Sequence, residues 1–259
     1  MKTTKTLIIT IAVLVLIVAT AMVLKAGLFS SVKDSYFTPD SDVLRKVPAG
    51  IVIVRPTRFP QAYGKIRHVH DGDSLARTVG QNATFRDMMA EAYDCSPGHV
   101  VLPADAPDGH FDFLVTVPET RKHLRTAIQK QTGYVAHHEE RNTDILVLKV
   151  QETSLPGLTV SAADEDSDII YKDGTLYFKH KQFDTIVEGL ENGLKLPILD
   201  QTGLTNYYDY SLVWNTNIAR HIETGNVDPD GVRRVLAGWG LRLDPDTASQ
   251  DMIIVEKSR

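Results

Sequence analysis

The chain has few of the residues and motifs that identify an enzyme or a disulfide-bonded protein. Its 259 residues include one cysteine, Cys95, which excludes an intrachain disulfide and a Cys-x-x-Cys redox or zinc site. The sequence also lacks the Gly-x-Ser-x-Gly and His-Glu-x-x-His arrangements of common hydrolases. We therefore expect Cys95 to be a small buried residue, and no motif assigns a reaction.

An excess of positive charge is also missing. The 28 basic and 33 acidic residues give a formal net charge of -5, which supplies no basic field for a polyanion. Nucleic acid is therefore not an expected partner. With 42% hydrophobic and 24% charged residues, the chain has the composition of a folded protein with a sizeable core.

One long hydrophobic run is present, at the amino terminus. Lys2 and Lys5 precede the stretch from Leu7 to Leu24, whose only polar members are Thr10 and Thr20. Such a run is long enough to cross the hydrocarbon layer as a helix. We therefore predict that residues 7–24 insert into a membrane.

The flanking residues predict the topology of this segment. Basic residues ahead of the run keep the amino terminus in the cytoplasm by the positive-inside rule. Residues 1–27 are thus predicted to anchor a single-pass inner-membrane protein, with residues 28–48 as a polar spacer and the carboxy-terminal part outside the cytoplasm. A cleaved signal segment is the alternative, since Ala19-Thr20-Ala21 resembles a cleavage site, and the chain would then be secreted.

The rest of the sequence contains an internal repeat. Apolar residues at the i, i+3, i+4 and i+7 spacing of a one-faced helix begin at Phe85 and again at Phe183. Each helix is followed by a short apolar segment, a polar turn and an alternating strand. That strand contains Phe111-Asp112-Phe113 in the first copy and Tyr208-Asp209-Tyr210 in the second.

Each copy continues with a second helix and ends in two apolar runs. The second helices are predicted around Leu124 to Ile128 and Val232 to Trp239. We predict that each copy closes with its own hairpin, which turns through Glu139 to Asn142 in the first copy and through Asp244 to Gln250 in the second.

The predicted fold class is α+β. We expect an amino-terminal transmembrane helix followed by two similar βαββ-type repeat units with mixed sheets, placed side by side. Residues 49–160 form the first unit, which opens with a strand closing on Arg55-Pro56, and residues 161–259 form the second.

The run from Leu196 to Trp214 carries a family resemblance. It contains Asp-Gln-Thr-Gly-Leu-Thr followed by a Tyr-Asp-Tyr strand that ends at tryptophan. This pattern resembles the signature of a large bacterial family, the soil-associated domain of unknown function of acidobacteria and their relatives. Weaker hallmarks also match, in Arg55-Pro56, Ala83-Thr84-Phe85 and Gly240-Leu241-Arg242-Leu243. The resemblance covers about residues 50–257.

The resemblance implies little about activity, because the family has none established. Its members look like secreted or membrane-anchored proteins, and some carry the domain behind an integral-membrane antirepressor peptidase. The helix, strand and hairpin pattern also looks like the short amino-terminal domains of secretins and TonB-dependent receptors, which are interaction modules of the envelope. That second likeness is an analogy of fold only.

Candidate ligand- or partner-binding residues lie within the signature run. Asp200 and Thr202 are able to brace a tight turn at Gly203 by hydrogen bonds to nearby amides, so they need no ligand to explain them. A ligand pocket that uses Asp200, Thr202 and Asp209 is the alternative. Tyr207 and Trp214, at the ends of the strand, form a candidate aromatic patch for a partner.

No metal site and no cofactor are predicted. His68 and His70 share a strand face and are the weaker metal candidates, but spacing supplies no third ligand. Neighbouring side chains in the segment 137–140 point to opposite faces, which favours a solvated hairpin tip. The aspartates between residues 164 and 168 imitate a calcium loop without its glycine, so we expect an exposed acidic linker there.

The expected function is a non-enzymatic binding or assembly module of the bacterial envelope, with an envelope protein as partner. The alternative is an envelope hydrolase whose site is assembled only in three dimensions, from His68, His70 and Asp73. The sequence does not identify a ligand or an oligomeric state.

Overall fold

The computed structural model describes residues 33–60, 64–72, 74–152, 154–162, 167–173, 175–213 and 229–258. The predicted anchor at residues 7–24 lies outside this part of the chain. Among the helices of the described residues, none combines the length and the apolar character that a membrane crossing requires.

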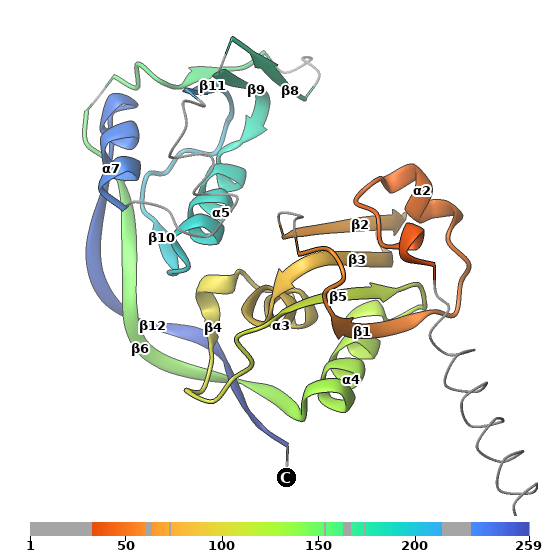
Figure 1. The fold of residues 1–259 in the computed structure, drawn as a ribbon. Coiled ribbons are helices and arrows are strands. Elements are labelled where there is room, and N and C mark those ends of the chain that lie inside the picture. Colours follow the sequence, from red (N-terminus) through yellow and green to blue (C-terminus); the bar gives the residue numbers. More distant parts are fainter. Residues whose placement is uncertain are drawn as a thin grey trace, which may run out of the picture.

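Two lobes are joined by a long pair of strands, and the fold is mixed α+β (Figure 1). Lobe 1 consists of η1 (Asp34–Tyr36), α2 (Ser41–Lys46), β1 (Val52–Pro56), β2 (Lys65–Asp71), β3 (Ser74–Thr84), α3 (Phe85–Tyr93), η2 (Pro97–His99), β5 (His110–Val115) and α4 (Thr120–Thr132). Lobe 2 consists of β7 (Thr159–Val160), β8 (Asp168–Lys172), β9 (Thr175–Gln182), α5 (Phe183–Leu194), β11 (Tyr207–Val213) and α7 (Pro229–Gly238). The connecting sheet contains β4 (Val100–Val101), β6 (Tyr134–Val150), β10 (Ile198–Asp200) and β12 (Leu241–Lys257).

Strands β6 and β12, which we call the ribbon, pair antiparallel along their whole length. Tyr134 lies opposite Lys257 at one end and Val150 opposite Leu241 at the other. Short strand β10 pairs in parallel with β6, and β4 pairs in parallel with β12, so each lobe adds one strand to the ribbon. Figure 1 shows the ribbon curving along both lobes.

The ribbon corrects the prediction that each copy closes with its own hairpin. The segment from Glu139 to Asn142 is polar but has no glycine or proline to force a turn, and it continues β6 without a break. Neither predicted hairpin forms, and β6 pairs with β12 instead. Residues 137–140 lie within the ribbon and not at a hairpin tip.

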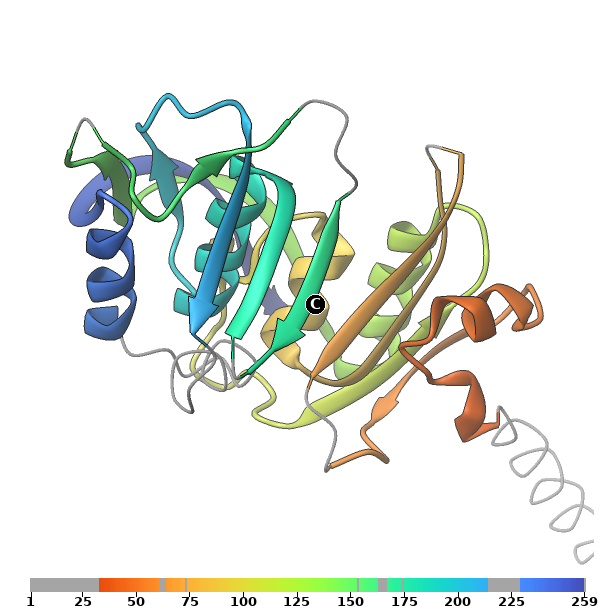
Figure 2. The same ribbon diagram turned by 90° about the horizontal axis from the view of Figure 1, so that it is seen from above.

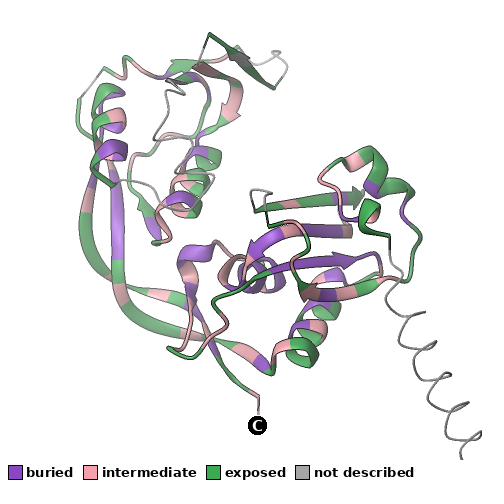
Figure 3. Cartoon of the chain, in the orientation of Figure 1, coloured by how far each residue is buried: buried purple, intermediate pink, exposed green. Residues whose placement is uncertain are grey.

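Each lobe has its own apolar core, and both cores use the ribbon. Tyr134, Ile253 and Val255 belong to the core beneath α3 and α4, and Leu148 and Leu241 belong to the core beneath α5 and α7. Figure 3 shows buried residues in the central strands of lobe 1, in the helices of both lobes and in parts of the ribbon. Separating the lobes would therefore expose apolar surface in both cores.

The two lobes have sheets of matching strand order. The order is β1-β5-β3-β2 in lobe 1 and β7-β11-β9-β8 in lobe 2, with antiparallel neighbours throughout. Helix α3 begins directly after β3, and α5 begins directly after β9. Viewed from above, the sheet of lobe 2 lies beside lobe 1 (Figure 2).

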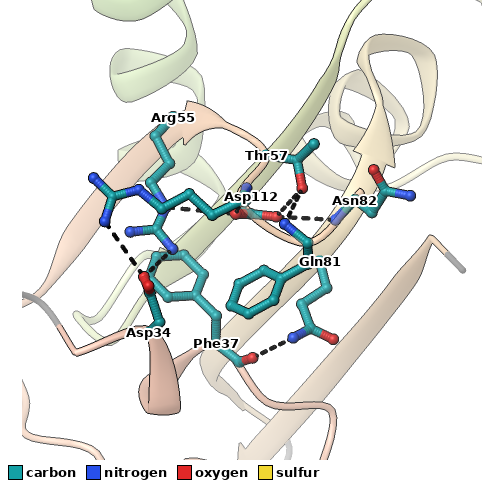
Figure 4. A network of polar contacts seen from close by, with 9 residues as sticks. Asp34, Phe37, Arg55, Thr57, Gln81, Asn82 and Asp112 are labelled. Carbon is teal, nitrogen blue, oxygen red and sulfur yellow. Dashed lines mark hydrogen bonds and ion pairs between the residues drawn. The ribbon is translucent and has the colours of Figure 1, made fainter. Parts of the chain in front are cut away.

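A buried carboxylate locks a backbone irregularity in lobe 1. Asn82 near the end of β3 has a left-handed backbone, with φ of 50°, where the pairing of β3 with β5 shifts register. Asp112 accepts hydrogen bonds from the Asn82 amide at 3.0 Å, the Thr57 hydroxyl at 2.8 Å and the Arg58 amide at 2.8 Å. Figure 4 shows Thr57 and Asn82 on either side of the Asp112 carboxylate, which therefore holds β1, β3 and β5 together.

Lobe 2 repeats this lock with different residues. His180 near the end of β9 has φ of 48°, and its amide donates to Asp209 at 2.9 Å. The Ser161 hydroxyl, which follows β7 as Thr57 follows β1, donates to the same carboxylate at 2.6 Å. Burial alone would raise the pKa of Asp209, but these hydrogen bonds lower it below its ordinary value.

The segment predicted as a polar spacer is a packed part of lobe 1 between residues 34 and 47. Its apolar residues Phe37, Leu44 and Val47 are buried against the face of the sheet that the helices do not cover. The Arg55 guanidinium lies 4.0 Å from the centre of the Phe37 ring and donates to Asp34 at 2.7 Å (Figure 4). The spacer prediction is therefore wrong here, because three well-spaced apolar residues suffice to cover the sheet.

One glycine is required by the packing of the lobe 1 sheet. A Cβ atom on Gly80 of β3 would lie 2.1 Å from a ring carbon of Phe113, which is fully buried on β5. The Phe113 ring thus occupies the space where a side chain would stand.

We predict that Asp112→Ala destabilises the protein more than Asp209→Ala. Asp112 is completely buried, and its loss leaves the amides of Asn82 and Arg58 without their acceptor, at a cost of about 3 kcal/mol. Asp209 has fewer donors and is nearer solvent, so about 1 kcal/mol is expected. Urea unfolding of the full chain, followed by circular dichroism, measures both losses. Equal losses of unfolding free energy in the two variants would contradict the prediction that Asp112 contributes more than Asp209.

Candidate functional site

A cavity of about 1030 Å³ lies between the two lobes. Lobe 1 lines it with α3 and with residues near the ends of β2, β3 and β5. Lobe 2 lines it with the carboxy-terminal half of α5, through Glu188, Glu191, Asn192 and Lys195. A molecule bound there would contact both lobes at once.

On the lobe 1 side, a buried glutamate links two strands to α3. His68 Nε2 of β2 lies 2.8 Å from Glu91 Oε2, and the Thr78 hydroxyl of β3 donates to Glu91 Oε1 at 3.2 Å. The side chain of Glu91 is 7% exposed and that of His68 is 37% exposed, so the imidazole faces the cavity while its partner is shielded. We call these three residues the Glu91 triad.

The fold does not require the Glu91 triad. In lobe 2 the position on β9 that corresponds to Thr78 is Leu176, and the position on α5 that corresponds to Glu91 is Gly189. The same strand and helix therefore form in lobe 2 without a buried carboxylate. Because a buried polar group needs partners that an apolar residue does not, its presence in lobe 1 alone marks the triad as a candidate functional feature.

The chemistry open to the triad is proton transfer by His68. A carboxylate on one imidazole nitrogen fixes the ring orientation and leaves the other nitrogen for a ligand. Thr78 has no exposed surface, so its hydroxyl is not an accessible nucleophile. Cys95 also lines the cavity, but burial and the nearby Asp94 carboxylate raise the pKa of its thiol to about 11, which keeps it protonated at neutral pH.

Two ion pairs connect the lobes beside the cavity. Lys195, in a left-handed conformation after α5, reaches Asp87 of α3 at 2.8 Å. His99 Nε2 of η2 lies 3.5 Å from Glu191 of α5, whose Oε1 also accepts the Ile198 amide at 2.7 Å. The main chains come equally close, since a Cβ atom on Gly98 would lie 2.7 Å from the backbone of Leu196. These contacts join the two lobes directly beside the cavity.

The second ion pair changes the titration of both its members. The hydrogen bond to Glu191 raises the pKa of His99 above its ordinary 6.5, although burial opposes this. Burial alone would raise the pKa of Glu191, but the hydrogen bonds from His99 and the Ile198 amide lower it below its ordinary 4.5. At pH values between 4.5 and 6.5, His99 is therefore mainly protonated and Glu191 mainly ionised.

We predict a pH-dependent contribution of this pair to stability. The part due to His99 is complete below pH 6.5 and is lost as the pH rises through its raised pKa, and the part due to Glu191 is present above pH 4.5 and is lost as the pH falls through its lowered pKa. Glu191→Gln should therefore cost about 1 kcal/mol of unfolding free energy at pH 5.5 and clearly less at pH 9. Glu188→Gln, on the exposed side of α5, is the matched control. A cost that stays constant or increases up to pH 9 would contradict the prediction.

Asp200 and Thr202 make the local hydrogen bonds predicted from the sequence. Asp200 accepts from the Thr202 amide at 2.8 Å, the Thr202 hydroxyl accepts from the Leu204 amide at 3.2 Å, and Gly203 has φ of 69°. Neither residue lines the cavity between the lobes. A binding role for this turn stays a prediction.

Tyr207 and Asp209 lie together near the bulge of lobe 2. The Tyr207 ring is stacked on His180 with centroids 4.2 Å apart, and Asp209 holds the amide of the same histidine. Asp209 thus has the locking role of Asp112 and does not join Asp200 in one pocket. Trp214, the other member of the predicted aromatic patch, lies outside the described residues.

The histidine pairs do not assemble a metal site among the described residues. The rings of His68 and His70 are 6.2 Å apart, as expected for one strand face, but His68 is bonded to Glu91. His138 in the ribbon is paired with Asp251 at 2.9 Å. Asp73, proposed as a third hydrolase residue, and Asp164 and Asp166 of the acidic segment lie outside the described residues.

Sequence reasoning missed Glu91 and Thr78. Glu91 stands three residues after Met88, so it borders the buried face of α3, and a charged residue there was the available signal. Thr78 gave no signal of its own, because its partner comes from the following helix.

The comparisons with known proteins place the chain in a family without assigning it a function. The model of a family described as "Protein of unknown function (DUF3738)" matches residues 86–257, which include lobe 2, the whole ribbon and the part of lobe 1 from α3 onward. No curated protein and no solved structure matches the chain. The resemblance to a family of unknown function is thereby confirmed, and the chain belongs to the DUF3738 family.

Proposed function

We propose that this chain is a membrane-anchored, extracytoplasmic binding or assembly module of the bacterial envelope, without catalytic activity and built by duplication of one α+β unit. The anchor rests on the hydrophobic run at residues 7–24 and the lysines ahead of it. The binding role rests on the cavity between the lobes.

Duplication is supported by features that packing alone does not demand. The matching strand orders coincide with a left-handed residue at the same place, Asn82 in β3 and His180 in β9. Each is held by an aspartate from the neighbouring strand, Asp112 or Asp209. Two unrelated lobes would have no reason to share this unusual lock.

One observation carries the binding proposal: the cavity is lined by two lobes that the ribbon and two ion pairs hold at a set distance. A preformed concave surface of this size suits recognition of another molecule. Its nearby ionised groups are largely engaged with each other, as in the pairs of Lys195 with Asp87 and Arg121 with Asp94. The Ser96 hydroxyl is shielded from solvent, and the Cys95 thiol is protonated at neutral pH.

A hydrolase is the second candidate, and the Glu91 triad favours it. A histidine held by a shielded carboxylate is able to take a proton from a water in the cavity. In this form the alternative uses His68 and Glu91 in place of the predicted set of His68, His70 and Asp73.

We predict that a photo-cross-linking residue at Asn192 captures an envelope protein in the native membrane. Asn192 lines the cavity on α5, and Thr247 on the exposed side of the ribbon is the matched control position. Full-length chains with the cross-linker at either position are illuminated in intact cells, and their products are compared on denaturing gels. A partner captured from Asn192 and absent from Thr247 is the expected result. Identical products at both positions, or none, would contradict binding at the cavity.

The hydrolase alternative predicts a different result. The purified full chain would hydrolyse p-nitrophenyl esters, and His68→Ala and Glu91→Gln would each lower the rate by roughly 100-fold. Tyr207→Ala, outside the cavity, is the control. Absence of turnover, or turnover that survives His68→Ala, excludes this alternative.

A further inference from the structure

Strand β8 is an open edge of the lobe 2 sheet. Its residues pair with β9 on one side, from Asp168 opposite Lys179 to Lys172 opposite Thr175, and β8 ends the order β7-β11-β9-β8. No other described strand pairs with its second side. Figures 1 and 2 show that second side directed toward the side of the molecule on which lobe 1 lies.

Along this edge the main chain of β8 presents hydrogen-bonding groups that have no partner strand. Lys172 and Thr175 flank the tight turn that contains Asp173, so alternation directs the amides and carbonyls of Lys172, Ile170 and Asp168 toward β9. Those of Ile169 and Tyr171 point outward. The Ile169 amide donates to the side chain of its neighbour Asp168 at 2.7 Å, as an amide without a ladder partner does.

The three central residues of this edge carry no charge that would protect it. Ile169 is 53% exposed and Ile170 is 38% exposed, on opposite faces of the strand. The corresponding edge of lobe 1, strand β2, carries two residues of like charge, Lys65 and Arg67, which disfavour pairing with another strand, whereas Asp168 and Lys172 at the two ends of β8 have opposite charges. Of the two equivalent edges, β8 is therefore the one suited to receive a strand.

We propose that β8 binds an extended segment of a partner protein as an additional antiparallel strand. The partner segment places a β-branched apolar residue opposite Ile170, a cation opposite Asp168 and an anion opposite Lys172. Its main chain bonds to the outward amides and carbonyls of Ile169 and Tyr171, on either side of the central pair. This inference goes beyond the proposed binding function, because no residue of β8 lines the cavity between the lobes.

The surroundings of β8 favour a slender occupant. Lobe 1 lies below the open side of β8 in Figure 1 and beside it in Figure 2. A single extended strand needs only about 5 Å of space beside the edge. A whole second copy that paired β8 with β8 would have to bring its own lobes into the region next to lobe 1.

The test is a charge-swap cycle with synthetic peptides. The probe is a fluorescent peptide with the core Asp-Thr-Ile-Thr-Lys, whose lysine lies opposite Asp168 and whose aspartate lies opposite Lys172 in the proposed register. The control peptide has the core Lys-Thr-Ile-Thr-Asp. Binding to the full chain in detergent is measured by fluorescence anisotropy for the wild type and for the double variant Asp168→Lys/Lys172→Asp.

We expect the wild type to prefer the first peptide and the double variant to prefer the second, each by roughly five-fold, because two charge pairs change sign together. Ile169→Pro should abolish binding of either peptide, because it removes an outward amide while keeping the pairing with β9. The circular dichroism spectrum of Ile169→Pro reports whether lobe 2 is folded in this variant. If lobe 2 is unfolded, the proposal is tested by the charge-swap cycle alone.

Equal binding of both peptides, or no binding, would overturn the proposal. Self-association that the swap abolishes and that the peptide does not inhibit would also overturn it, since the occupant would then be a second copy. A partner cross-linked from Asn192 together with failed peptide binding would refute only the β8 site and leave the proposed function standing.

Discussion

The pairing of β6 with β12 is the interaction on which the rest of the structure depends. These two 17-residue strands are the only continuous structure shared by both cores in the described part of the chain. One end of the ribbon supports α3 and α4, and the other supports α5 and α7. Because the ribbon sets the distance between the lobes, it also sets the cavity between them, and the ion pairs of Lys195 and His99 adjust that distance only locally.

The two lobes are alike in their strands and differ in what covers them. Both use an aspartate to hold a left-handed residue, but among the described residues a segment packed on the outer face of the sheet, residues 34–47, is found in lobe 1 alone. Only lobe 1 buries a polar triad beneath α3. In lobe 2 no described segment covers the outer face of the sheet or pairs with the second side of β8. The Glu91 triad thus belongs to lobe 1, and the accessible strand edge of β8 belongs to lobe 2.

Local sequence patterns predicted most of the helices and strands. They did not predict which strands pair when the partners are far apart in the sequence. The one-faced helices that begin at Phe85 and Phe183 were predicted from spacing alone and are confirmed as α3 and α5. The family was predicted from the run after Leu196 and is confirmed. The hairpins were wrong because apolar runs carry no information on whether they pair within a copy or between copies. The Glu91 triad was missed because it joins β2, β3 and α3 in space.

Hydrogen exchange in the Gly80→Ala variant tests most directly whether the ribbon makes the two lobes one cooperative unit. The new methyl group is driven into the Phe113 ring and destabilises lobe 1 by about 1–3 kcal/mol. If the ribbon couples the cores, the amides of Leu146 and Leu148 at the lobe 2 end should lose nearly as much protection as those of lobe 1. Unchanged protection at Leu146 and Leu148, with faster exchange confined to lobe 1, would contradict the account.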